Sequence, residues 1–212
     1  GIAVLASTST TITSEVTSVA IAVGLGGATT QVRATVLANG STTATLGSSA
    51  DLTAANGAVV VTALAGLRGT SDLQGGAGSI GLATTGLSST VDIRDSVLAD
   101  VANGASVDAG ALTVSAGTLA TPVNRKATST ISGGSGALVA VTTVTTRATV
   151  QGSTVARIGA ATVRTSGATS VRAASTGTAT VSAASVSVGV ADISKLIAQA
   201  QVLDPAAGKA TS

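Results

Sequence analysis

The sequence lacks six residue types on which binding and catalytic sites often depend, because Phe, Trp, Tyr, Met, Cys and His are all absent. Without cysteine the chain can form neither a disulfide nor a thiolate metal site, and without histidine most zinc sites and the usual nucleophile–base pairs are excluded as well. Nucleic-acid-binding proteins usually show a basic patch with stacking aromatic residues, and neither is visible here. We therefore expect no cofactor, no metal, no nucleic-acid partner and no enzymatic activity.

Charged residues and long apolar segments are also scarce. Only 9% of the residues are charged, and the formal net charge is +2. No segment approaches the 18 or so apolar residues of a membrane-spanning helix, so we expect no membrane span. Residues 1–10 lack the basic region of a signal peptide, and the chain begins with Gly rather than Met. We interpret the sequence as a processed or excised piece of a larger protein.

Small residues dominate what is present: 42 Ala, 35 Thr, 26 Gly and 26 Ser make up 129 of the 212 residues. In segments such as 10–24 and 177–191, Val, Ile and Leu alternate with Ser, Thr and Ala, and Asn-Gly, Gly-Gly or Ser-Gly pairs separate such segments. A two-residue period interrupted by these pairs is typical of short strands joined by tight turns. The composition and the period together predict an all-β fold with a narrow interior.

Internal repetition is the strongest signal in the chain. One block aligns three arginines at similar intervals: Arg33, Arg94 and Arg147. A second block aligns four alanines at intervals of the same size: Ala6, Ala63, Ala116 and Ala173. A third element is a glycine pair that occurs at residues 26–27, 75–76 and 133–134. A unit of about 55 residues therefore recurs roughly three and a half times.

Repeated strands without aromatic residues favour a parallel β-helix, or β-solenoid, whose narrow interior is filled by stacked Val, Ile, Leu and Ala. We predict a solenoid rod over residues 1–190, with repeats at approximately 1–28, 29–86, 87–142 and 143–190. If each unit holds three coils of about 18 residues, the chain has on the order of eleven coils and a length of roughly 50 Å.

The last segment, residues 191–212, departs from the repeat and is predicted to form a short C-terminal helix followed by a tail. Over residues 192–203, Ile193, Leu196 or Ile197, Ala200 and Leu203 recur at helical spacing, and Asp192 is a suitable N-cap. Pro205 and Gly208 would end the helix. Such a helix could cover the open strand edges of the last coil, or it could lead into a linker of the parent protein.

The order of these elements resembles the passenger repeats of large bacterial filamentous adhesins, the filamentous-haemagglutinin-like and leukotoxin-type group. The resemblance is clearest in ADVANGASVDAGALTVSAGTLAT (99–121) and looser in ARIGAATVRTSGATSVRAASTGTA (156–179), and it extends over nearly the whole chain. It implies a right-handed parallel β-helix, secretion to the bacterial cell surface, and adhesion or filament building. No catalytic residue comes with it.

Three sets of polar residues could carry chemistry on such a scaffold. The only dense acidic cluster comprises Asp92, Asp95, Asp100 and Asp108, which could serve a polysaccharide-degrading enzyme or bind calcium. The repeated Arg33, Arg94 and Arg147 could form a sparse basic stripe that attracts anionic glycans, or they could simply keep an apolar rod soluble. Thr-x-Thr pairs suggest ice binding, but they fall at irregular intervals.

These features favour a structural and adhesive segment of a secreted, extracellular bacterial adhesin. Its expected partners are neighbouring coils of a longer parent chain, other copies of itself and host or environmental glycans. The alternative is a self-assembling extracellular filament subunit that stacks end to end through exposed terminal strands. A polysaccharide-degrading β-helix and an ice-binding protein are less favoured alternatives.

Overall fold

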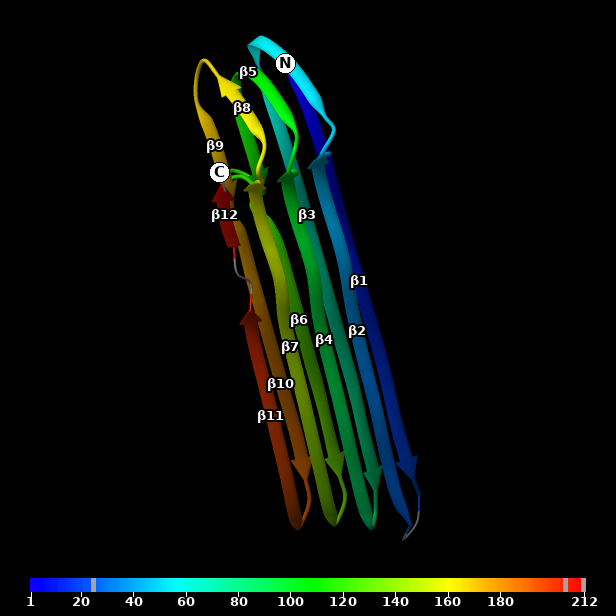
Figure 1. The fold of residues 1–212 in the computed structure, drawn as a ribbon. Helices are drawn as coiled ribbons and strands as arrows, with labels where there is room; N and C mark the ends of the chain where they lie inside the picture. Colours follow the sequence, from blue (N-terminus) through cyan, green and yellow to red (C-terminus); the bar gives the residue numbers. More distant parts are fainter. Residues whose placement is uncertain (24–25, 204–205, 211–212) are drawn as a thin grey trace.

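The computed structural model describes residues 1–23, 26–203 and 206–210, and these residues form strands joined by short turns, with no helix among them. The strands lie in two sheets, A and B, and all the pairings between described strands are parallel. Figure 1 shows the long strands running in the same direction within each sheet. The predicted all-β fold with parallel, solenoid-like strands is confirmed. In the described part of the chain, no helix is long and apolar enough to cross a membrane.

The chain alternates between the two sheets, and one passage through each sheet makes one coil. Sheet A contains β1 (Ile2–Ala22), β3 (Asp51–Ser79), β5 (Ser106–Ala116), β6 (Val123–Gly136), β8 (Thr162–Thr165), β9 (Thr169–Ala173) and β10 (Ser175–Val188). Sheet B contains β2 (Gly27–Leu46), β4 (Leu82–Val101), β7 (Val139–Ile158), β11 (Ala191–Leu203) and β12 (Ala206–Ala210). The first two coils are β1–β2 and β3–β4, the third is β5–β7, and the fourth is β8–β12.

Each sequence repeat forms a single coil, so the prediction of three short coils per repeat is wrong. Ile2 pairs with Val59, and Val139 pairs with Ala191, so the chain returns to the same place in its sheet only after a whole repeat. Strands of 20 residues, such as β2, are about 65 Å long, whereas four coils stacked at about 4.8 Å add up to roughly 15 Å. The described chain is therefore a wide, flat slab (Figure 1) rather than the long rod that was predicted.

The strands are long because most of the glycine pairs expected at turns lie inside strands. The pair Gly75–Gly76 is within β3, where a Cβ on Gly75 would come within 2.7 Å of the Leu87 side chain of the opposite sheet. Glycine here makes space for a neighbouring side chain instead of reversing the chain. Asn103–Gly104 does form a turn, in which Gly104 has a positive φ of 82° that favours glycine.

Residues at the same register in successive coils form columns, and the inward-facing columns build the core. The predicted alignment of Ala6, Ala63, Ala116 and Ala173 is confirmed, since each pairs directly with the next. A neighbouring inward column consists entirely of valine: Val4, Val61, Val114 and Val171. Like residues stacked on one another fill the interior without aromatic side chains.

A group of buried hydroxyls lies between two aliphatic parts of this core, which follow one another along the strand direction. The Ser89 Oγ lies 2.8 Å from Ser71 Oγ and 2.6 Å from Ser129 Oγ, and the Thr146 Oγ1 donates to Ser129 Oγ at 2.7 Å. All four side chains are buried. Because their hydroxyls bond to one another, these polar side chains are accommodated inside the slab, between two clusters of aliphatic residues.

Residues 191–203 do not form the predicted helix but the strand β11, which pairs in parallel with β7. In this register Leu196 is opposite Val144, Ala200 is opposite Ala148, and Val202 is opposite Val150. The segment thus continues the small and aliphatic columns of sheet B, and β7 offers it a complete row of backbone hydrogen-bonding groups. Pro205, which was expected to end the helix, lies outside the described residues.

Candidate functional site

An ion pair lies in the interior, between Arg125 of β6 and Asp95 of β4. Both side chains are buried, with exposed fractions of 0% and 1%. The Arg125 Nε donates to the Asp95 Oδ1, and its Nη2 donates to the backbone carbonyl of Ser153 at 3.1 Å. Asp95, one of the four aspartates singled out from the sequence, is thereby engaged inside the core, where no substrate could reach it.

The other members of the acidic cluster are also separated from one another. On the outer face of sheet B, Asp92 pairs with Arg94 at 2.6 Å, and Asp100 accepts two hydrogen bonds from Arg157, at 2.8 and 3.3 Å. Hydrogen bonding to Asp100 and the attraction of its charge raise the pKa of Arg157 above its ordinary value. Asp108 lies in β5 of sheet A. These carboxylates do not converge as a glycosidase or calcium site requires.

The remaining charges are distributed unequally between the two outer faces. Among the residues whose side chains the structure describes, the outer face of sheet A carries four cations and four anions: Arg68, Lys126, Arg164, Arg172, Glu15, Asp51, Asp72 and Asp108. The outer face of sheet B carries five cations and two anions: Arg33, Arg94, Arg147, Arg157, Lys195, Asp92 and Asp100. Sheet B is therefore the basic face of the slab.

The three arginines that the repeat alignment places together all lie on this basic face, but not in one column. Arg33 pairs with Ser88, Arg94 pairs with Gln151, and Arg147 pairs with Thr90. Along the strand direction, Arg33 is therefore level with residue 88 of β4 and Arg147 with residue 90, whereas Arg94 is itself a residue of β4. Arg94 is held by Asp92, whereas the Arg147 Nε donates to Thr149 Oγ1 at 3.3 Å. The alignment selected the correct face but not the register.

A shallow hollow of about 450 Å³ lies on the basic face beside Arg33. Its centre is Gly86 of β4, which is flanked by Gln31 of β2 and Thr143 of β7 in the same column. A Cβ on Gly86 would meet nothing closer than the Gln31 Cγ, at 3.5 Å, so the hollow exists because residue 86 has no side chain.

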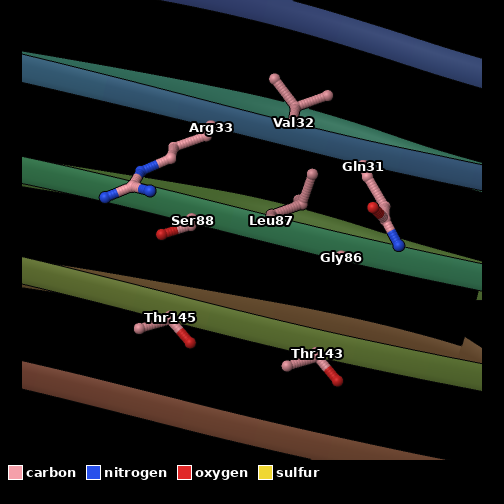
Figure 2. A pocket seen from close by; sticks show the side chains of 8 residues that line it. All are labelled: Gln31, Val32, Arg33, Gly86, Leu87, Ser88, Thr143 and Thr145. Carbon is pink, nitrogen blue, oxygen red and sulfur yellow. The ribbon is translucent and has the colours of Figure 1, made fainter.

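Polar groups surround this hollow, as Figure 2 shows. The Arg33 guanidinium and the Gln31 amide extend over β4 from β2, and the hydroxyls of Ser88, Thr143 and Thr145 lie along β4 and β7. A guanidinium can bind a carboxylate or sulfate through two hydrogen bonds, while amides and hydroxyls can bind the hydroxyl groups of a sugar. The hollow could thus hold one acidic sugar residue, without the stacking that an aromatic side chain would provide.

Threonine columns on the outer faces do not form the regular array expected of an ice-binding surface. On sheet A, one column is threonine in all four coils: Thr13, Thr70, Thr128 and Thr180. The next column contains Arg68 and Lys126, which are opposite each other. The pair Thr43 and Thr45 of β2 continues in β4 as Leu98 and Asp100.

No family model, curated protein or solved structure matches this chain. The site is therefore interpreted from its own geometry. The charge imbalance between the faces and the hollow at Gly86 were not found from the sequence, because both depend on the register between coils. The alternation of polar and apolar residues in the sequence indicates that each sheet has a polar outer face. It does not show which residues of different strands are neighbours on that face, because this depends on the pairing of β2 with β4 and of β4 with β7.

Proposed function

We propose that this chain is a structural and adhesive segment of a secreted bacterial surface adhesin, similar to the filamentous-haemagglutinin-like group. The observation that carries the proposal is the unbroken stacking of coils: β2, β4, β7 and β11 pair in order, and all of these pairs are parallel. Each coil rests only on its neighbours, so the cohesion is local and can be extended by further coils.

The basic face of sheet B supplies the adhesive part of the proposal. It has five described cations and two aspartates, and both aspartates are neutralised by Arg94 and Arg157. Arg33 and Lys195 are in no hydrogen bond or ion pair within the described residues, so they are free to bind an anion. A sulfated or carboxylated glycan lying across the strands would meet the Arg33 hollow first, and would then meet Arg147 and Lys195.

Chromatography on immobilised heparin, a sulfated glycan, tests this role. Arg33→Ala should elute at a clearly lower salt concentration than the unaltered protein, because Arg33 is the cation beside the hollow. Arg68→Ala is the matched control, since it removes one exposed arginine from the charge-balanced face of sheet A. Equal shifts for the two variants would mean that only net charge matters, and no retention of the unaltered protein would exclude the glycan-binding role.

A self-assembling filament subunit is the second candidate, and a specific observation favours it. Within the described residues, β1 and β10 each pair with a strand on one side only, as do β2 and β11. The valine column that begins at Val4 and ends at Val171 would continue from the last coil of one copy into the first coil of the next. Electron microscopy of the isolated chain tests this, because particles of uniform single-slab size would contradict end-to-end stacking.

A further inference from the structure

The narrow side on which the chain passes from sheet A to sheet B is aliphatic in every coil. Val23, Ile80, Leu138 and Val190 occupy this turn in coils one to four, and their exposed fractions are 94%, 56%, 54% and 88%. They form one column, because each follows strand residues that are paired in register: Ala22 with Ser79, Gly78 with Gly136, and Gly136 with Val188. These turns are at the lower end of Figure 1.

Exposed aliphatic side chains continue from this column onto both faces. On sheet A, four flank it at the end of the first and last coils, and on sheet B two more begin the strands β4 and β7. We define the aliphatic edge as these ten residues: Val19, Ile21, Val23, Ile80, Leu82, Leu138, Val139, Val186, Val188 and Val190. None of them is charged.

The opposite narrow side shows that turns of this solenoid do not need aliphatic residues. There the chain returns from sheet B to sheet A through small and polar residues, including Ser48 and Ser49 in the first turn and Asn103 and Gly104 in the second. The Asn103 Oδ1 accepts a hydrogen bond from the Ala160 backbone N–H of the next coil, at 2.8 Å. Such residues satisfy turn geometry, whereas the aliphatic edge exposes hydrophobic surface that contributes little to the fold.

We infer that the aliphatic edge is a lateral interface with a second copy of this chain, so that two slabs associate edge to edge. The side chains of the column are spaced by the coil repeat of about 4.8 Å, and a second solenoid presents the same spacing to interdigitate with. The ten residues expose an area on the order of the 800 Å² per partner that a standard interface buries. Because the edge carries no charge, two copies with the same net charge meet there without pairing like charges.

This inference does not rest on the proposed adhesive or filament function, because it concerns the side of the slab and not its basic face or its terminal strands. An end-to-end filament uses the backbone edges of the first and last coils, whereas the lateral interface uses side chains from all four coils. Substitutions at the aliphatic edge should therefore leave any end-to-end stacking unchanged, and Arg33→Ala should still lower heparin retention more than Arg68→Ala does in their presence.

The absence of native cysteine makes disulfide cross-linking a direct test. Single variants Ile80→Cys and Leu138→Cys, alone and mixed, should form disulfide-linked dimers under mild oxidation. Cross-linking of each variant with itself indicates parallel slabs, and cross-linking only in the mixture indicates antiparallel slabs; both support the interface. Ser49→Cys, an exposed residue on the opposite side, is the matched control and should form no disulfide between copies. Equal cross-linking of all three variants would overturn the inference.

Sedimentation equilibrium provides the second measurement on the intact chain. The double variant Ile80→Asn/Leu138→Asn should raise the dimer dissociation constant at least about tenfold, because buried aliphatic contacts at the centre of an interface are replaced by amides. Thr90→Asn, on the outer face of sheet B, should leave it unchanged. An unaltered protein that is monomeric at about 100 μM would overturn the inference. The inference would also be overturned if the double variant dimerised as tightly as the unaltered protein but bound uncharged phosphatidylcholine vesicles less well, because the edge would then contact lipid instead of a second copy.

Discussion

Arg125 and Asp95 form an ion pair although they belong to opposite sheets and to consecutive coils. The pair joins β6 of the third coil to β4 of the second, and it is enclosed by aliphatic residues of the main core cluster. A shift of one sheet by two residues relative to the other would leave both charges buried without their partner. The ion pair therefore favours the observed alignment of the two sheets, as does the fit of Leu87 against Gly75 and Gly133 of the opposite sheet.

Removing one member of this pair should destabilise the protein strongly. Arg125→Met leaves the Asp95 carboxylate buried without its counter-charge, and we expect a loss of about 3–5 kcal/mol in the free energy of unfolding. The double variant Arg125→Met/Asp95→Val removes both charges and should recover most of that loss. Urea unfolding followed by circular dichroism measures both values. A double variant that is as unstable as Arg125→Met would contradict this explanation. The control is Arg94→Ala, which breaks the ion pair with Asp92 on the outer face, and its expected loss in the free energy of unfolding is below about 1 kcal/mol.

The column that contains Asp95 has glycine both above and below it, and the two glycines should respond differently to alanine. Gly40, Asp95 and Gly152 share one register. A Cβ on Gly152 would lie 2.5 Å from the Arg125 Nε and 2.7 Å from the Asp95 Oδ1, whereas a Cβ on Gly40 would meet nothing closer than the Leu67 Cδ2, at 3.4 Å. We expect Gly152→Ala to cost about 1–3 kcal/mol and Gly40→Ala to cost less than about 1 kcal/mol in urea unfolding. Similar losses at the two positions would show that the enclosed ion pair does not cause the difference.

The stability should not depend on pH between about 6 and 9, because no side chain of this sequence has an ordinary pKa in that range. The pKa of Arg157 is raised, mainly by its hydrogen bond to Asp100 and also by the negative charge of that carboxylate. A raised pKa on a basic group contributes stability that is fully present below its unfolded-state pKa and is lost only as the pH rises through the folded one. For an arginine that loss lies far above this range. Urea midpoints across it should agree, apart from a small effect of the terminal amine, and a clear slope would show a titrating group in the folded core.

The sequence allowed the strands, the parallel solenoid and the repeat length to be predicted, because alternation and self-similarity are local patterns. The alanine column from Ala6 to Ala173 could be aligned correctly, since its surrounding block has few insertions. The number of coils per repeat could not be found in this way. In the sequence, a glycine pair that forms a turn cannot be distinguished from a glycine pair inside a strand. Gly75–Gly76 is of the second kind, because the Leu87 side chain of the opposite sheet packs against Gly75, and this contact is seen only in the folded structure.

The last strand and the basic face show a second limit. Residues 191–203 have apolar residues at helical spacing, yet β11 forms because β7 offers an open backbone edge in register with it. Pairing with a neighbouring strand decides between the two patterns, and a single segment does not contain that information. For the same reason Arg33, Arg94 and Arg147 could be placed on one face but not at their true positions, which are staggered along β4.

The two-strand coil also determines how the molecule responds to force. A body about 65 Å wide with sheets about 10 Å apart resembles a ruler: it resists bending within its plane far more than bending across its thickness. Bending rigidity grows with the cube of the dimension in the bending direction and only linearly with the other dimension. The ratio of the two rigidities is therefore the square of the ratio of width to thickness, which is more than about tenfold. Each added coil lengthens the ruler by only about 4.8 Å, although it takes a whole repeat of sequence. For a given number of residues, this wide coil therefore makes a broader body that is stiffer within its plane, whereas a narrower coil would make a longer one.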